Sequence, residues 1–171
     1  MTLRASVPPV LFARGRFEEV SVTTAELLSF MREHSLAVQA SVSAAEGPQA
    51  AVVGIVVGDD LEVFFDAADT SRKVNNLRRN PRIALVIGGT IGGDERTVQY
   101  EGVADEPTGA ELQRLKRLYF ESFPDGRERQ TWPGITYIRT RPTWIRYTDF
   151  NREPPESIEF DLAELGVDAS G

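Results

Sequence analysis

Residues 61–87 read LEVFFDAADTSRKVNNLRRNPRIALVI, and the spacing of their apolar residues changes twice. From Leu61 to Phe65 apolar residues alternate with others, which predicts a strand. A spacing of three residues follows over Ser71–Arg79 and predicts a short helix that ends at Asn80-Pro81. The apolar run Ile83–Ile87 predicts the next strand. The stretch is therefore expected to form a strand–helix–strand unit.

The start of this helix carries a combination of groups that suits an anion. Helix N-termini leave backbone N–H groups unpaired and carry partial positive charge. The Ser71 hydroxyl and the bases Arg72 and Lys73 would lie in that first turn, which together forms a cradle for a phosphate. The alternative is that Thr70 or Ser71 only caps the helix and that both bases point into water.

Charge is unevenly distributed along the chain. The 171 residues include 26 acids and 19 bases, which gives a net charge of −7. Residues 70–93 nevertheless contain five bases and no acid, whereas residues 153–171 contain six acids and no base. The basic stretch is either a local anion site or a solvated helix face, and composition alone does not decide between them. The acidic average argues against a general nucleic-acid surface.

The chain has few side chains that could perform chemistry alone. The absence of cysteine excludes disulfides, thiol nucleophiles and iron–sulfur sites. Because His34 is the single histidine, a two-histidine zinc site is excluded. No clustered spacing of carboxylates indicates a metal site with oxygen ligands. We therefore expect no metal site, and expect a bound organic cofactor to supply any redox or group-transfer chemistry.

The rest of the chain indicates one domain, mainly β, over residues 1–171. Residues 1–22 read as an irregular arm and 153–171 as an acidic tail that either packs on the barrel or is solvated. Strands are expected at 36–43, where Leu36, Val38, Ala40 and Val42 alternate with smaller or polar residues, at 51–57 and at 97–104, and a closing hairpin at 135–140 and 143–148. Helices are expected from the capping-box spacing Thr23–Glu26 and from Pro107 onward. Six or so strands with few helices indicate a small antiparallel β-barrel.

Two further expectations concern location. The longest apolar run, residues 50–58, is too short to span a bilayer as a helix. No export signal is visible near the N-terminus. We therefore expect a cytoplasmic protein without a membrane partner.

The quoted stretch resembles a known family. Ser71-Arg72-Lys73, Asn76-Leu77 and Asn80-Pro81-Arg82 before a strand are similar to the pyridoxamine-5'-phosphate-oxidase-like, FMN-binding split-barrel family. Residues 96–102 resemble the next strand of that family, and the resemblance covers about two thirds of the chain. It implies a six-stranded antiparallel split β-barrel of Greek-key type, with flanking helices.

The resemblance also implies a cofactor and its contacts. Arg72 and Lys73 would grip the phosphate of FMN, with Ser71 assisting. The other cofactor-binding residues that it implies are Asp66 and Ala67 along the phosphate and ribityl path, Val52 and Val53 through their backbone, and Thr97 or Gln99. Family members are usually two-fold dimers with both flavins at the interface, so a homodimer is expected.

Departures from the family pattern argue against vitamin B6 oxidase activity. The oxidases that process vitamin B6 hold the phosphate of their substrate with a lysine and an arginine, and this chain has Val56 and Phe123 at those places. The family's Arg-Leu-His triplet is also missing. The pattern therefore favours the general-stress or uncharacterised branch, with Tyr119 and Trp132 as candidates for a substrate pocket, although aromatic residues in a barrel more often fill its core.

Three functional hypotheses follow. The first is an FMN-dependent oxidoreductase acting on a small molecule or electron donor. The second is a protein of the same fold that binds or senses flavin, deazaflavin or haem without turnover. The third is a cofactor-free interaction domain whose basic stretch is only surface.

Overall fold

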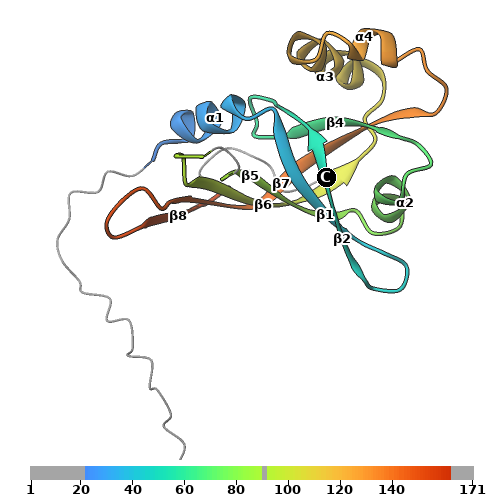
Figure 1. The fold of residues 1–171 in the computed structure, drawn as a ribbon. Coiled ribbons are helices and arrows are strands. Elements are labelled where there is room, and N and C mark those ends of the chain that lie inside the picture. Colours follow the sequence, from blue (N-terminus) through green and yellow to red (C-terminus); the bar gives the residue numbers. More distant parts are fainter. Residues whose placement is uncertain (1–21, 90–91, 163–171) are drawn as a thin grey trace, which may run out of the picture.

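The structure, a computed structural model, describes residues 22–89 and 92–162 and consists of one curled antiparallel sheet with four helices around it (Figure 1). The strands follow the spatial order β2-β1-β5-β6-β7-β4-β3, and β8 pairs with β7 outside this path. Their bounds are β1 Leu36–Val42, β2 Pro48–Gly54, β3 Val56–Val57, β4 Val63–Ala68, β5 Arg82–Gly88, β6 Arg96–Asp105, β7 Ile135–Asp149 and β8 Glu156–Phe160. The helices are α1 Thr24–Glu33, α2 Arg72–Arg79, α3 Gly109–Ser122 and α4 Gly126–Arg129.

A bend at Ile55 makes the sheet curl on itself. The two end strands of the path, β2 and β3, are consecutive in the chain and are separated by this single buried residue. Its N–H donates to the Ser35 carbonyl at 2.9 Å. The strand expected at 51–57 is therefore two strands, of which β2 pairs with β1 and β3 pairs with β4. The sheet forms a half-barrel, and counting β2 and β3 as one bent strand leaves six strands around it.

Helices cover the barrel on different sides and create two apolar clusters. Leu27, Phe30 and Met31 of α1 and the apolar residues of α2 pack into the barrel interior. The capping box predicted for α1 is present, because Thr23 Oγ1 accepts from the Glu26 N–H and the Glu26 carboxylate accepts from the Thr23 N–H. A second, smaller cluster lies under α3, which together with α4 stands beside the sheet (Figure 1).

The expected hairpin at 135–148 is wrong, because these residues form the single strand β7. Proline lacks an N–H group and usually interrupts a sheet, which made Arg141-Pro142 look like a turn. In the structure one edge of β7 pairs with β4 up to Thr140 and with β8 from Ile145 onward. Pro142 lies in the interval between the two partners, beside an irregularity in the β6–β7 register at Gly102. Its missing donor therefore disrupts no pairing on that edge.

The buried face of β1 is not the face that carries its larger apolar residues. The residues that face the barrel interior are Ala37, Gln39 and Ser41, and all three are buried. Leu36 is exposed and Val38 half-buried on the outer face, opposite Val52 of β2 and Val86 of β5. The polar residues of this strand are therefore enclosed and its larger apolar residues face outward.

The ends of the chain are described in part. Residues 156–160 of the acidic tail form β8, which pairs with β7, and Phe160 packs against the interior cluster. The expected arm at residues 1–22 lies almost entirely outside the described residues, as do residues 90–91 and 163–171. The helix expected from Pro107 begins two residues later, at Gly109. No helix in the described part of the chain is long and apolar enough to cross a membrane.

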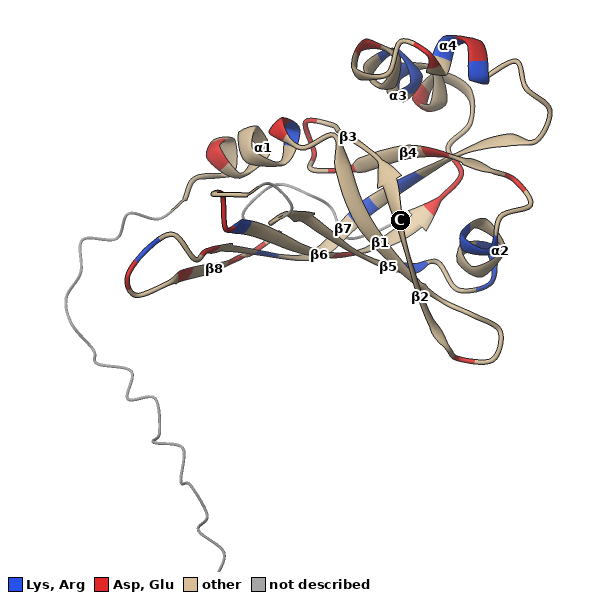
Figure 2. Ribbon diagram, in the orientation of Figure 1, with Lys and Arg blue, Asp and Glu red and all other residues tan. Residues whose placement is uncertain are grey.

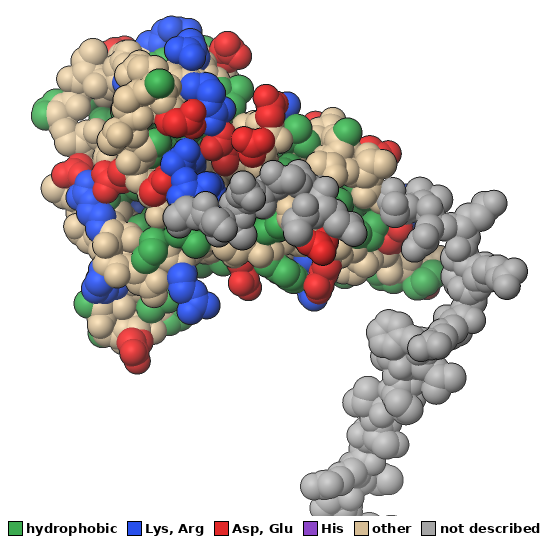
Figure 3. Space-filling view, turned by 180° about the vertical axis from the view of Figure 1, so that it is seen from behind, with side chains coloured by type: hydrophobic (Ala, Val, Ile, Leu, Met, Phe, Trp, Pro, Cys, Tyr) green, Lys and Arg blue, Asp and Glu red, His purple; other side chains and the backbone are tan. Residues whose placement is uncertain are grey.

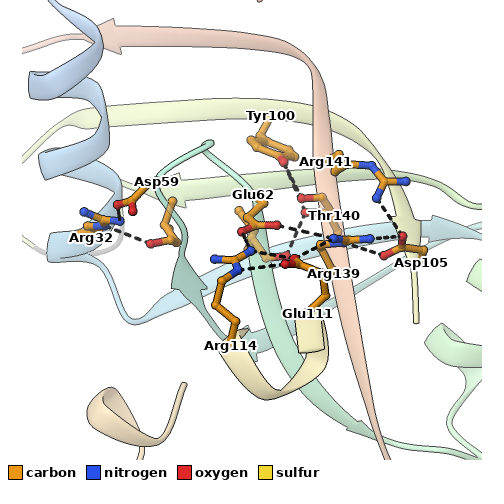
Figure 4. A network of polar contacts seen from close by, with 12 residues as sticks. Arg32, Asp59, Glu62, Tyr100, Asp105, Glu111, Arg114, Arg139, Thr140 and Arg141 are labelled. Carbon is orange, nitrogen blue, oxygen red and sulfur yellow. Dashed lines mark hydrogen bonds and ion pairs between the residues drawn. The ribbon is translucent and has the colours of Figure 1, made fainter. Parts of the chain in front are cut away.

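A network of charged side chains ties α3 to the sheet (Figure 4). The nearly buried carboxylate of Glu62 forms an ion pair with Arg114 of α3, and Arg139 lies 3.9 Å from it. Arg139 also pairs with Asp105 at 2.6 Å, and Arg141 pairs with the same carboxylate at 2.9 Å. Seen from behind, basic and acidic side chains are intermixed where the helices meet the sheet (Figure 3). Burial raises the pKa of Asp105, but hydrogen bonds and charge from the two arginines outweigh it and hold that pKa below its usual value.

We expect Arg139→Gln to lower the free energy of unfolding at pH 7 by about 1–3 kcal/mol, because it removes charge-assisted hydrogen bonds from a partly buried site. A lowered pKa in the folded state stabilises the protein above the unfolded pKa of about 3.9, and this contribution is lost as the pH falls through the folded pKa. The difference between wild type and variant, measured by urea unfolding, should therefore shrink below about pH 4.

Arg32→Gln is the matched control. Arg32 pairs with the highly exposed Asp59 at 2.7 Å and donates to the Val57 carbonyl at 3.0 Å, so its loss should destabilise the protein less than the loss of Arg139 does. A difference between wild type and Arg139→Gln that does not change from pH 7 to pH 3 would contradict the role given to Asp105.

Candidate anion-binding site

The inner face of β1, residues 48–51 of β2 and the first turn of α2 surround a pocket of about 590 Å³. Its lining consists of Gln39, Ser41, Pro48, Gln49, Ala50, Ala51, Ser71, Arg72 and Lys73. This lining holds two bases and no carboxylate. Figure 2 shows basic residues and no acidic residue on α2, in agreement with its sequence RKVNNLRR. The pocket is therefore electropositive and suits an anion.

The N-terminus of α2 directs unsatisfied donors at this pocket. The N–H of the N-cap residue Ser71 donates to the Ala68 carbonyl at 2.9 Å, and the first N–H within α2 that reaches a backbone acceptor is that of Asn75, which donates to the Ser71 carbonyl at 3.1 Å. The N–H groups of the three preceding residues are thus the unpaired donors of a helix end. Ser71 occupies the N-cap position without capping through its side chain, and its buried Oγ has no hydrogen-bond partner in the described structure.

Polar side chains lie between Ser41 and Arg72. Asn76 of α2 lies 3.2 Å from Ser41 Oγ and 2.7 Å from the side-chain amide of Gln49. Turning the Gln49 amide over points its oxygen at Arg72, where it accepts from Nε of that guanidinium at 3.0 Å, and this orientation replaces the hydrogen bond from Asn76 Nδ2 to Gln49 Oε1. Gln49 therefore orients Arg72 without neutralising it, because an amide carries no charge.

The four bases of α2 differ in what they contact. Arg78 pairs with Asp69 and, at 2.6 Å, with Glu106, and Arg79 donates to the Val42 carbonyl at 2.6 Å. Arg72 and Lys73, in contrast, form no ion pair with any residue in the described ranges. The two bases at the C-terminal end of the helix bond to groups of the fold, whereas the two at its N-terminal end have no carboxylate partner in the described ranges.

The other residues that the resemblance implied are more scattered. Val53 is buried on the inner face beyond the pocket lining, and Ala67 is buried in the barrel interior. Val52 is 63% exposed on the outer face of β2. Thr97 is half-buried between Gly88 and Thr148, whereas Gln99 is exposed on the outer face of the sheet. The structure thus joins Ser71, Arg72 and Lys73 in one pocket and leaves Val52 and Gln99 on the opposite face of the sheet.

Asp66 lies in a different cluster, at the junction with α3 and α4. Its carboxylate accepts from Arg129 Nε at 3.1 Å, and Arg129 Nη2 donates to the Tyr119 hydroxyl at 3.3 Å. Burial, together with the charge of Asp66, raises the pKa of Tyr119, so this phenol stays protonated at neutral pH. Trp132 is 52% exposed whereas Tyr119 is buried, so the two candidates for a substrate pocket have different environments.

The same junction lacks the cationic pair that the resemblance assigns to vitamin B6 oxidases. Val56 is buried in the cluster under α3, and the Phe123 ring stacks on Tyr119 with centroids 4.8 Å apart. The nearby cation, Arg129, is paired with both Asp66 and Asp125. Its charge is therefore already compensated by carboxylates of the chain.

Sequence reasoning missed four polar residues around the pocket, namely Gln39, Ser41, Gln49 and Asn76. Gln39 and Ser41 alternate along β1 as regularly as the apolar residues do, so this polar alternation was the available signal. Polar residues on a strand are ordinarily placed on its solvent face, and only closure of the sheet shows that these are inside.

The fold is that of a split-barrel protein, and an electropositive pocket lies at the N-terminus of α2. The family model for pyridoxamine 5'-phosphate oxidase matches residues 23–149. The chain therefore belongs to the pyridoxamine 5'-phosphate oxidase family, although it lacks the cationic pair described above. No match was found among curated proteins.

Solved structures with the same fold include proteins named for heme and for general stress. A heme binding protein from Mycobacterium smegmatis aligns with a TM-score of 0.69 and 17% identity, covering 81% of this chain and 59% of that one. HutZ, the heme storage protein from Vibrio cholerae, aligns with a TM-score of 0.61 and 16% identity over 70% of this chain and 89% of its own. General Stress Protein 26 from Bacillus anthracis aligns with a TM-score of 0.58 and 19% identity, covering 77% of this chain and 94% of that one. At these identities the likeness shows the shared fold.

The division of charges on α2 predicts opposite effects on stability. Arg78→Gln should lower the free energy of unfolding, because it breaks the ion pairs with Asp69 and Glu106. Arg72→Gln should leave it unchanged or raise it by a few tenths of a kcal/mol, because a positive charge at a helix N-terminus is unfavourable. Urea unfolding of the two variants measures this difference, and equal destabilisation would show that Arg72 has a structural role.

Proposed function

We propose that this protein binds FMN, with the phosphate group held by Ser71, Arg72 and Lys73, and that it is a flavoprotein of the oxidoreductase type. One observation carries the proposal: a pocket of about 590 Å³ contains two bases without carboxylate partners in the described structure, beside a buried hydroxyl without a partner. Membership of the pyridoxamine 5'-phosphate oxidase family supports it.

The residues of the pocket fit a phosphate ester. Backbone N–H groups at the start of α2 and the Ser71 hydroxyl supply hydrogen bonds to phosphate oxygens, and Arg72 and Lys73 supply charge. Gln49 fixes the direction of the Arg72 guanidinium, which lowers the conformational entropy that binding would otherwise cost. When bound, FMN would supply hydride or electron transfer to a small molecule. The chain's own part is to bind and orient the cofactor, and we assign no acid–base catalyst.

We further propose that the protein is a homodimer that uses the outer face of β2, β1 and β5. Two rows of apolar residues cross these strands there, Val52–Val38–Val86 and Ala50–Ala40–Ala84. Val52 is 63% and Val86 43% exposed, which is unusual for large apolar residues on one flat surface. Gln99 lies beside Val86 on the same face. A second copy that covers this face would contact two of the residues that the resemblance associates with the flavin, Val52 and Gln99.

Haem is the second candidate ligand, because two of the similar structures are named as heme proteins. The one histidine, His34, is buried and its Nδ1 lies 2.9 Å from the Phe30 carbonyl, so Nε2 is the nitrogen left for a metal. His34 is not part of the pocket lined by Arg72 and Lys73. The site geometry therefore favours a phosphate ester over haem.

The proposal predicts that the purified protein binds FMN and prefers it to riboflavin, which lacks the phosphate. Replacing Arg72 and Lys73 together by Ala should weaken FMN binding about 100-fold or more, because two charge-assisted hydrogen-bonding groups are lost. Riboflavin binding should change little. Quenching of flavin fluorescence during titration measures both ligands.

The matched control replaces Lys116 and Arg117 by Ala, because they form another adjacent pair of bases and lie on α3 rather than around the pocket. This control should bind FMN like wild type. A wild-type protein that binds no FMN, or a double variant at 72 and 73 that binds it normally, would overturn the proposal. Binding of hemin without binding of FMN would favour the second candidate.

The dimer proposal has a separate test. Val86→Asp places a charge in the middle of the apolar rows and should shift the mass seen by sedimentation velocity from twice 18.9 kDa to 18.9 kDa. Phe150→Asp is the control, since Phe150 is an exposed apolar residue just after β7 and away from this face. A wild-type protein that sediments as a monomer at micromolar concentration would refute the dimer.

A further inference from the structure

Gln39 is a second residue of the pocket, beside Ser71, with a buried polar atom that has no hydrogen-bond partner in the described structure. It lies in the middle of β1 on the inner face, and only 1% of its surface is exposed. Its Oε1 is buried and accepts no hydrogen bond, and its side-chain amide donates none to the residues that the structure describes. Buried polar side chains are nearly always hydrogen-bonded, so this amide calls for an explanation.

The polar side chains next to Gln39 do form hydrogen bonds within the fold. Ser41, two residues further along the same face of β1, contacts Asn76, and Asn76 contacts Gln49. Gln39 belongs to none of these contacts, although it lines the same pocket. Its cross-strand partners are Ala51 in β2 and Leu85 in β5, whose apolar side chains offer no hydrogen bond.

The register sets the distance between Gln39 and the basic end of the pocket. Ser41 pairs with Gln49, which contacts Arg72, and Gln39 pairs with Ala51 one step further along the hairpin. Two residues along a strand span about 7 Å. A phosphate at Arg72 and Lys73 therefore places the first carbons of its ester chain, and the groups attached to them, next to Gln39.

We propose that Gln39 is a ligand-binding residue that hydrogen-bonds a hydroxyl group on the carbon chain of the phosphate ester. A carboxamide offers both an acceptor and donors, and a hydroxyl group is the small neutral group that matches both. The assignment rests on the proposed function for its phosphate anchor, and it adds that the pocket recognises a polyol phosphate rather than phosphate alone.

The experiment compares three probes, inorganic phosphate, D-ribitol 5-phosphate and FMN, by isothermal titration of wild type and Gln39→Leu. Wild type should bind D-ribitol 5-phosphate more tightly than inorganic phosphate. Gln39→Leu should weaken the binding of both hydroxylated probes about tenfold, the size of one net hydrogen bond, and leave that of inorganic phosphate within twofold. Gln39→Met, with a side chain of similar length, is a second variant in case Leu does not fit the core.

Thermal unfolding without ligand tests whether the unpaired Gln39 amide destabilises the folded protein. Removing an unsatisfied buried amide should raise the Tm of Gln39→Leu or Gln39→Met above that of wild type. Gln113→Leu, the same change at an exposed position of α3, is the control and should alter neither binding nor Tm appreciably.

The outcomes distinguish the assignment of Gln39 from the proposal that the protein binds FMN. Unchanged binding of the hydroxylated probes by the Gln39 variants would overturn the assignment and indicate that a buried water satisfies the amide. Equal weakening of all three probes would also overturn it, because Gln39 would then support the pocket without contacting a hydroxyl. If wild type binds D-ribitol 5-phosphate but not FMN, the proposed function fails, and Gln39 is judged on the ribitol phosphate data. If wild type binds none of the three probes, both claims fail.

Discussion

Closure of the sheet at Ile55 is the constraint on which the site depends. Because the chain bends there, β2 continues into β3, and the strands at the two ends of the sheet become neighbours in sequence. One face of β1 is thereby enclosed. That face carries Gln39 and Ser41, and burying polar groups is unfavourable unless they find partners. The interior is consequently apolar where α1 packs into it and polar beside the start of α2, and the pocket lies in this polar part.

The distribution of charge on α2 follows the same division. Arg78 and Arg79 at its C-terminal end interact favourably with the helix dipole and bond to groups of the fold. Arg72 and Lys73 stand at the N-terminal end, where the dipole disfavours positive charge, and they have no carboxylate partner in the described ranges. Placing two bases there reduces stability slightly and concentrates positive potential on one pocket. Sites that bind ligands commonly show such local departures from the most stable arrangement.

Family membership and fold do not by themselves specify the reaction. The pyridoxamine 5'-phosphate oxidase family match and the shared split barrel describe the scaffold, and the similar structures include proteins named for heme and for general stress. Around Tyr119 the chain has Val56 and Phe123, and Arg129 is paired with Asp66 and Asp125. Two further cations, Lys116 and Arg127, lie over aromatic rings of this cluster. The pocket at α2 differs from this cluster because its two bases lie beside the unpaired backbone donors of a helix end.

The sequence by itself determined the elements whose signals are local. The helix at residues 72–79, the capping box at Thr23 and Glu26, and the strands on either side of α2 depend on residues only a few positions apart, so periodicity and caps were sufficient. The basic helix start was also readable from the residues, and family resemblance added the split barrel and the expectation of FMN as the ligand. The tertiary structure alone decided which face of β1 is enclosed, that Pro142 lies within a strand, and which arginines of α2 are neutralised. Each of these depends on a partner distant in the chain, such as Glu106 for Arg78 or β8 for β7, and no local pattern records such a partner.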